Sequence, residues 1–174
     1  NIIAGILKRD EGSVQFGGKD VEFNHPLEAM STGISLMHQE LSLVPNATVA
    51  ENIYLRREKR GRFGLNDWAA MNREAAKVFE RIGVDIDPSA MVGTLSIGMR
   101  QLVELAKAIA LDAKLVILDE PTSSLSEKET AEFFKVMSGL KSQGVSQIFI
   151  SHKLSELFEV SDRITVLRDG GKST

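Results

Sequence analysis

An unbroken apolar run, Leu-Val-Ile-Leu at residues 115–118, leads directly into Asp119, Glu120 and Pro121. Strands that are buried on both faces of a parallel sheet have such unbroken runs, whereas half-exposed strands alternate apolar and polar residues. Ile-Phe-Ile at residues 148–150 predicts a second strand of the same kind. These runs restrict the chain to an α/β fold with a parallel-sheet core.

Helical and strand-like segments alternate through the last third of the chain. We expect helices over residues 97–110, 127–141 and 153–160, and strands over 115–119, 147–151 and 163–168. Ser126 and Glu129 have the spacing of a capping box, which supports a helix that begins at residue 127. This alternation is typical of a parallel sheet whose strands are joined by helices.

The first part of the chain predicts a small antiparallel sheet. Residues 13–16 and 21–23 flank Gly-Gly-Lys-Asp, which is typical of a β-hairpin. Residues 1–7 resemble the last turns of a helix, and residues 34–37 form a short apolar strand candidate.

A helical insertion follows. Thr48 and Glu51 make a capping box for a helix over 49–55, and Asn66 or Asp67 caps a helix that ends near Ile82. The insertion separates two core segments, 1–44 and 94–174, and itself forms a helical subdomain of about residues 45–93.

Composition limits the class of protein. The 174 residues suffice for one domain, with 21 Lys and Arg against 24 Asp and Glu, a formal net charge of −3. That balance argues against a nucleic-acid binder, which usually has a basic excess. Cysteine is absent, which excludes disulfides and thiolate metal sites. No apolar run approaches the ~20 residues that cross a bilayer, and no signal peptide is recognisable. Because the chain begins at Asn1 rather than Met, we expect it to be part of a longer protein.

Four polar residues follow predicted strands at their carboxyl ends, where open α/β sheets bind ligands. Asp119 can bind Mg²⁺ through a water molecule, and Glu120 can orient or deprotonate an attacking water. His152 lies at the same predicted edge and can hydrogen-bond a terminal phosphate. Gln39 follows residues 34–37, and its amide oxygen can reach a metal ion or a water. The simpler interpretation is that each is an ordinary polar residue at a strand end, and the residues alone leave both interpretations open.

Ser96, Ile97 and Gly98 open a strongly periodic helix. A helix N-terminus presents free N–H groups and partial positive charge, which suit a phosphate. Ser96 can cap the helix and donate to a phosphate oxygen, and Gly98 lacks a Cβ, so that a ligand can approach the backbone. An ordinary Ser-capped helix is the alternative.

These segments, in this order, resemble the ATP-binding cassette family. Gln39 matches its Q-loop, residues 95–101 its signature motif, residues 115–121 its Walker B strand, residues 123–126 its D-loop and His152 its switch histidine. Finer motifs resemble the ATPase subunits of bacterial sugar importers of the ribose, galactose and xylose type, and more closely the N-terminal of their two cassettes. These motifs lie at residues 37–45, 49–55, 101–108, 150–154 and 162–170.

The resemblance implies a P-loop NTPase-like fold, ATP and Mg²⁺ as cofactors, and ATP hydrolysis that powers an importer for a monosaccharide. Glu120 and His152 would be catalytic, and Gln39 and Asp119 would bind the metal and nucleotide. Ser96 and Gly98 would face the ATP of a second, head-to-tail cassette.

The same resemblance implies partners and a location. Transmembrane permease subunits would dock on the helical insertion, near the basic stretch at residues 56–62, for which a solvated loop is the alternative. The protein would lie peripherally on the cytoplasmic face of the bacterial inner membrane and would bind no nucleic acid.

The sequence departs from the family pattern in three places. Ile97 and Met99 stand where the usual signature has Gly and Gln, and the Walker A loop is not within the chain. The tail Gly-Lys-Ser-Thr at residues 171–174 imitates the end of a Walker A loop, either as a displaced piece or as a chance match. Two other interpretations therefore remain: a soluble ABC-type ATPase that acts on nucleic acid or ribosomes, and a non-catalytic module. We expect the isolated chain to bind ATP weakly or not at all.

Overall fold

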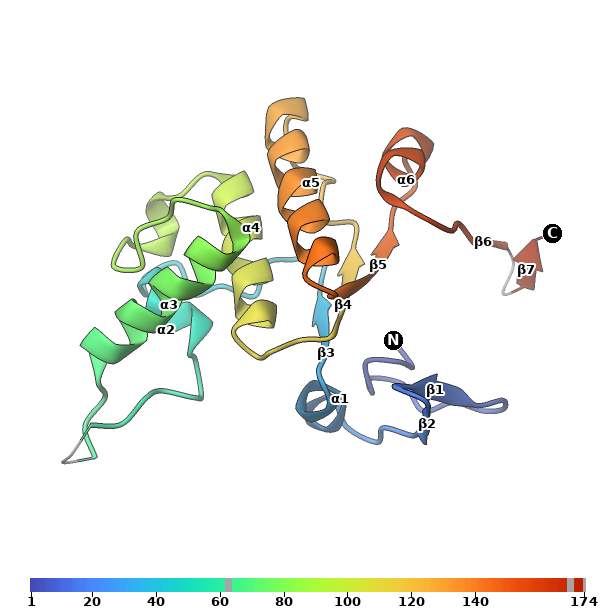
Figure 1. Ribbon diagram of the computed structural model, residues 1–174, viewed down its shortest axis with the longest axis horizontal. Coiled ribbons are helices and arrows are strands. Elements are labelled where there is room, and N and C mark those ends of the chain that lie inside the picture. Colours follow the sequence, from blue (N-terminus) through green and yellow to red (C-terminus); the bar gives the residue numbers. More distant parts are fainter. Residues whose placement is uncertain (62–63, 169–170, 174) are drawn as a thin grey trace.

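A three-stranded parallel sheet forms the centre of the protein in the computed structural model, which describes residues 1–61, 64–168 and 171–173. Its strands are β3 (Ile34–Met37), β4 (Leu115–Asp119) and β5 (Ser146–Ile150), in the order β3-β4-β5 (Figure 1). Met37 is the register partner of Leu118, and Asp119 that of Ile150. The carboxyl ends of all three strands therefore meet at one edge, and the predicted strand over 115–119 is confirmed.

The central strand β4 separates two hydrophobic cores, because successive side chains of a strand point to opposite faces. Val116 and Leu118 join the larger core, which contains residues of the helices α2 to α5. Leu115 and Ile117 join a smaller core with Ile34 and residues that precede it. Burial of β4 on both faces agrees with its unbroken apolar run.

β5 differs from the prediction of burial on both faces. Its residue Phe149 packs edge-to-face on Phe134, with ring centroids 5.9 Å apart, so one face is covered. The other face carries Ile148 and Ile150, which are 36% and 45% exposed. Among the described residues, the smaller core has members on β3 and β4 and none on β5. Apolar composition thus predicted the strand correctly but not what covers it.

Two long helices cover the larger core. α4 (Ile97–Ile109) contacts β3, and α5 (Glu127–Ser142) contacts both α4 and β5. The predicted caps are present: Ser96 accepts from the N–H of Met99, and Ser126 and Glu129 form the reciprocal bonds of a capping box. A short helix, α6 (Leu154–Val160), follows β5.

The helical insertion packs on the same core through α4. It consists of α2 (Val49–Ile53), α3 (Trp68–Ile82) and a 3₁₀ turn, η1 (Val92–Thr94). The Thr48–Glu51 capping box and the Asp67 cap are confirmed, whereas α2 ends two residues before the predicted position 55. Figure 1 shows this part on the side of α4 opposite the β1–β2 hairpin.

The N-terminal part forms a hairpin and a short helix beneath the sheet. β1 (Val14–Phe16) and β2 (Lys19–Val21) pair antiparallel around Gly17 and Gly18, whose φ angles of 58° and 76° suit a tight hairpin turn. α1 (Pro26–Thr32) contacts β3. The predicted hairpin is confirmed, but its second strand lies at Lys19–Val21 rather than at residues 21–23, because the turn takes only Gly17 and Gly18.

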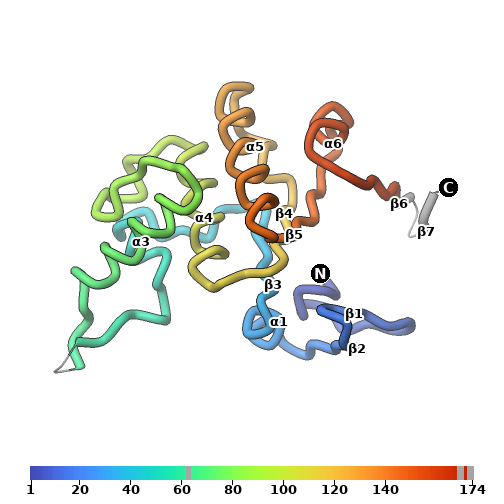
Figure 2. The backbone as a smooth tube through the Cα atoms, in the orientation of Figure 1, coloured from blue at the N-terminus to red at the C-terminus, as the bar shows by residue number. Residues whose placement is uncertain are grey.

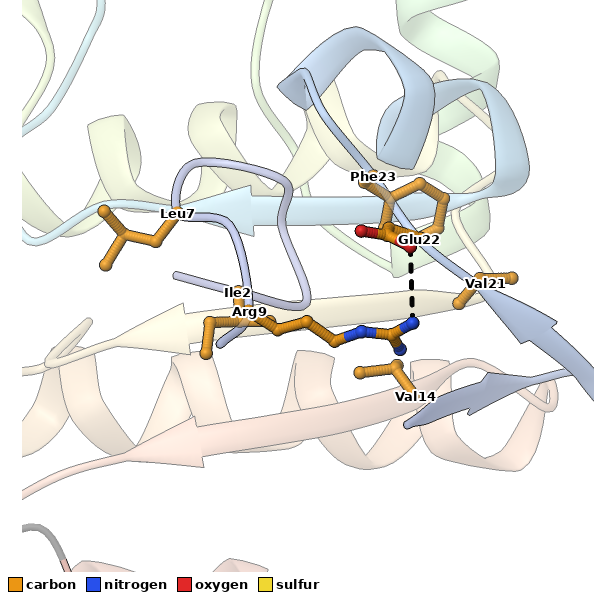
Figure 3. A pocket seen from close by; sticks show the side chains of 7 residues that line it. All are labelled: Ile2, Leu7, Arg9, Val14, Val21, Glu22 and Phe23. Atoms are coloured by element: carbon orange, nitrogen blue, oxygen red, sulfur yellow. Dashed lines mark hydrogen bonds and ion pairs between the residues drawn. The ribbon is translucent and has the colours of Figure 1, made fainter. Parts of the chain in front are cut away.

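The expected helix end at residues 1–7 is wrong. The segment forms hydrogen-bonded turns, because Gly5 takes a left-handed φ of 69° that stops a helix. Beside it lies a small cavity of about 10 Å³, at which Arg9 pairs with Glu22 at 3.3 Å (Figure 3). Apolar side chains complete its lining: Ile2, Leu7, Val14, Val21 and Phe23.

The C-terminal strand also differs from the prediction. β6 (Val166–Arg168) is shorter than the expected strand over 163–168 and pairs antiparallel with β7 (Gly171–Ser173), outside the β3-β4-β5 sheet. Figure 2 shows β6 at the end of an extended connection from α6. Residues 171–173, which imitate a Walker A loop, are strand here, and Thr174 lies outside the described residues. Within the described parts of the chain, no helix is both long and apolar enough to span a membrane.

Candidate functional site

The carboxyl-end edge of the sheet brings the predicted site residues together. Gln39 follows β3, Asp119 ends β4, Glu120 comes next, and His152 follows β5. The N–H of Glu120 donates to the carbonyl of Ile150 at 2.9 Å, which fixes the turn out of β4. Glu120 has a φ of 47°, a left-handed conformation that costs a non-glycine residue about 1–2 kcal/mol. Such strain is concentrated at functional sites.

The Glu120 carboxylate is held from both neighbouring strands. Gln39 Nε2 donates to Glu120 Oε2 at 3.2 Å, and His152 Nδ1 lies 3.1 Å from Glu120 Oε1. An ionised carboxylate only accepts hydrogen bonds, so this contact is a hydrogen bond in the forms of the imidazole that carry a proton on Nδ1. The carboxylate is thereby oriented at the sheet edge, as a general base for a water requires.

Gln39 and Asp119 also line an open cleft of about 510 Å³, together with His38, Glu40, Leu41 and Ser42. The described residues contain no group of three or more His, Cys, Asp and Glu side chains that could hold a metal. A site with one carboxylate and one amide fits Mg²⁺, which keeps several waters and binds mainly to one or two carboxylates and substrate phosphates. The donor set therefore suits a magnesium nucleotide better than a fully protein-bound metal.

A buried carboxylate that the sequence did not reveal ties the site together. Glu156 on α6 is 7% exposed. It accepts hydrogen bonds from Thr122 Oγ1 at 2.6 Å, Lys153 Nζ at 2.9 Å and Ser151 Oγ at 3.2 Å. Thr122 follows Glu120 by two residues, and Ser151 and Lys153 flank His152. Glu156 thus joins the two segments that carry Glu120 and His152.

The charge of Glu156 is preserved in spite of its burial. Burial raises the pKa of this carboxyl, but the hydrogen bonds from Thr122, Lys153 and Ser151 outweigh it and hold the pKa below its ordinary value of 4.5. A Glu four residues after a strand-end His was the only sequence signal. Its partners are up to 34 residues away in the chain.

Ser96 and Gly98 lie at the N-terminus of α4, as predicted, but their contacts go to Glu129. The Ser96 hydroxyl and the Gly98 N–H both donate to Glu129 Oε1, each at 3.2 Å. Among the described residues, no hydrogen bond joins them to Gln39, Asp119, Glu120 or His152. The structure therefore forms two sites, one at the sheet edge and one at the start of α4.

The segment after Gln39 is hydrogen-bonded to α4, the helix that Ser96 caps. The N–H and hydroxyl of Ser42 donate to Glu104 Oε1 at 2.7 and 2.8 Å, and Lys107 Nζ donates to Ser42 Oγ at 3.0 Å. Glu104 has a side chain only 10% exposed and also pairs with Lys107. Hydrogen bonds thus connect the segment that follows Gln39 to the helix that Ser96 caps.

A parallel sheet with carboxylates and an amide at its carboxyl edge is typical of open α/β proteins that bind a ligand there, nucleotide-binding proteins among them. The sequence model of the ABC transporter family matches residues 1–123. The chain belongs to this family, which confirms the resemblance drawn from its motifs.

Curated relatives agree with the sugar-importer motifs. The chain is 48% identical over 169 residues to a putative ribose/galactose/methyl galactoside import ATP-binding protein 2 of Burkholderia lata, covering 97% of this chain and 32% of that protein. It is 46% identical over 170 residues to the ribose import ATP-binding protein RbsA of Geobacillus kaustophilus, covering 97% of this chain and 34% of that protein. The chain spans about a third of the length of these relatives.

Solved structures confirm the fold class. A nucleotide-free ATP-binding cassette from an ABC transporter matches with a TM-score of 0.85 and 25% identity, over 100% of this chain and 72% of that one. The ADP conformation of MJ1267, an ATP-binding cassette of an ABC transporter, matches with a TM-score of 0.84 and 26% identity, over 99% of this chain and 72% of that one. The α/β cassette architecture predicted from the motifs is therefore correct.

Proposed function

We propose that the protein to which this chain belongs binds and hydrolyses ATP and thereby powers a bacterial importer for a monosaccharide. The main support for this proposal is the position of the Glu120 carboxylate, which lies between Gln39 and His152 and next to Asp119. Two relatives named as sugar import ATP-binding proteins support the substrate class.

In this proposal the residues at the sheet edge act by positioning and electrostatics. Asp119 and Gln39 would hold Mg²⁺, and the ion would supply positive charge that offsets the charge of the phosphates. Glu120 orients the attacking water and accepts a proton from it as the water oxygen bonds to the γ-phosphorus and the bond to the ADP oxygen breaks. His152 fixes Glu120 through Nδ1, and in the doubly protonated ring its second nitrogen would also donate to a γ-phosphate oxygen.

Ser96 and Gly98 would act on a different nucleotide from Glu120. They would donate to the phosphates of ATP held by a second cassette in a head-to-tail pair. Closure of that pair would drive transmembrane permease subunits that dock on the helical insertion at about residues 45–93. The protein would then lie peripherally on the cytoplasmic face of the inner membrane.

The test is Glu120→Gln in the complete protein with its permease. Gln keeps the size of the side chain but cannot accept the proton, so ATP should bind with unchanged affinity while turnover falls by about 10²-fold or more. Glu159→Gln, at an exposed position on α6, is the matched control and should keep the wild-type ATP affinity and turnover. Normal turnover in the Glu120 variant would refute the role given to this carboxylate.

A second measurement addresses the substrate. Reconstituted vesicles should take up a monosaccharide only when ATP is supplied, and ribose and galactose are the first sugars to try, in view of the relatives. ATP turnover that responds to nucleic acid or ribosomes, and not to the permease, would contradict the importer assignment.

A further inference from the structure

The phosphate-facing end of α4 already carries an anion from this chain. Glu129 Oε1 accepts from Ser96 Oγ and from Gly98 N, both at 3.2 Å. Its other oxygen, Oε2, accepts from Ser126 Oγ at 2.8 Å and Ser126 N at 3.1 Å. One carboxylate therefore serves two helix N-termini, those of α4 and α5.

Gly98 is shaped for this contact. It is buried, and a Cβ at this position would lie 2.7 Å from Glu129 Oε1 and 2.8 Å from Glu129 Cγ. The close approach that sequence reasoning assigned to a ligand is made here by a side chain of the same chain. Hydrogen bonds from Ser126, and more weakly from Gly98 and Ser96, hold the pKa of Glu129 below its ordinary value, so that it is charged at neutral pH.

We propose that Glu129 is a further functional residue at the N-terminus of α4. It positions Ser96 and Gly98 and is displaced from them by the phosphate of the second cassette's ATP. The proposal rests on the proposed function, because it requires that phosphate to approach α4.

The donors cannot serve both anions at once. A hydroxyl and a backbone N–H each have one proton to donate, and both protons already point to Glu129 Oε1. A phosphate within hydrogen-bond distance of the same groups would also meet the negative carboxylate at close range, where like charges repel. Glu129 must therefore leave before the phosphate binds.

Glu129 can leave Ser96 and Gly98 without losing all of its hydrogen bonds. The bonds from Ser126 to Oε2 belong to the α5 capping box and do not involve α4. The side chain can release Ser96 and Gly98 and keep the cap of its own helix. Glu129 thus has two sets of partners, and its charge opposes closure of the cassette pair.

The experiment compares Glu129→Gln with Glu127→Gln in the complete protein, both in the hydrolysis-deficient Glu120→Gln background. Gln at this position of a capping box retains the cap but loses the charge. Glu127 is exposed in the first turn of the same helix and has no place in the proposed site. The readout is the ATP concentration for half-maximal closure, measured by energy transfer between one fluorophore on each cassette.

We expect Glu129→Gln to lower this ATP concentration by about three- to tenfold, as loss of a competing anion at a helix N-terminus should. Glu127→Gln should leave it unchanged. Glu129→Ala, which removes charge and cap together, should lower both the ATP requirement and the melting temperature, and so separate the charge effect from folding.

Equal ATP requirements for Glu129→Gln and Glu127→Gln, or a higher one for Glu129→Gln, would overturn the inference and leave the proposed function intact. No ATP-driven closure in the Glu120→Gln parent itself would instead refute the proposed function, and the inference with it.

Discussion

Replacement of Glu156 by Ala tests how the site is held together. The carboxylate joins Thr122, two residues after Glu120, to Ser151 and Lys153, which flank His152. The substitution removes the acceptor for all three side chains at once. It touches neither Glu120 nor His152 directly, so any effect on chemistry must act through their positions.

The magnitude follows from burial. Thr122 is 1% exposed, so its hydroxyl is left without a partner away from water, which costs about 1–3 kcal/mol. The Lys153 side chain is 39% exposed and can turn to solvent, so its lost ion pair adds at most about 1 kcal/mol. With a smaller loss at Ser151, the total is about 3 kcal/mol of unfolding free energy. Glu156→Gln keeps one acceptor for Thr122 and should lose about half as much.

Urea unfolding of the complete protein, with amide exchange of residues 151–160 to locate the effect, measures this loss. With a urea slope of about 2 kcal/mol/M, the midpoint should fall by about 1.5 M. Ser155→Ala, at an exposed position on the same helix, is the control. Because His152 and Glu120 lose their common support, kcat should fall by about tenfold or more with little change in KM for ATP. A midpoint equal to that of Ser155→Ala refutes the stability argument, and an unchanged kcat refutes the positioning role.

Two further predictions concern stability alone. Asn52→Ala should cost about 2–4 kcal/mol, because the buried Asn52 side chain accepts from Val44 N at 2.7 Å and donates to the carbonyls of Val44 and Thr48. Urea unfolding checks this against the exposed Asn46→Ala, and a loss no larger than in Asn46→Ala would contradict it. The depressed pKa of Glu156 means that its folded form releases the proton more readily than the unfolded chain. Its contribution to stability should be complete above about pH 4.5 and disappear as the pH falls through the folded pKa, so wild type and Glu156→Gln should converge in acid. A stability difference that stays constant down to about pH 3 would contradict this reasoning.

Local signals predicted most of the fold. The run at residues 115–118 and the two capping boxes at Thr48 and Ser126 depend on neighbours within four residues, and all are present in the structure. The order of these elements, together with the motifs, was enough to predict the α/β cassette and to place Gln39, Glu120 and His152 at one edge.

Contacts between distant segments were not predictable in the same way. Ile148 and Ile150 are as apolar as the residues of β4, but whether a face is covered depends on which other segments reach it. The expected strand over 163–168 failed for a similar reason, since β6 pairs with β7 rather than with the sheet. Glu129 was recognised as a capping residue, but its second role requires α4 and α5 to lie side by side.

The two sites are connected through α4, which makes polar contacts near each of them. From the sheet edge, Ser42 binds Glu104 on α4, and the N-terminus of α4 binds Glu129 on α5. Contacts alone do not establish coupling, which requires an element with two discrete arrangements that both sites bias. The proposed displacement of Glu129 would supply such an element, because Ser126 can keep one carboxylate oxygen while Ser96 and Gly98 exchange the other for a phosphate. In the proposed exchange, a phosphate at the start of α4 would replace only the Oε1 contacts of Glu129, while Oε2 would keep the α5 cap at Ser126, six residues after Glu120.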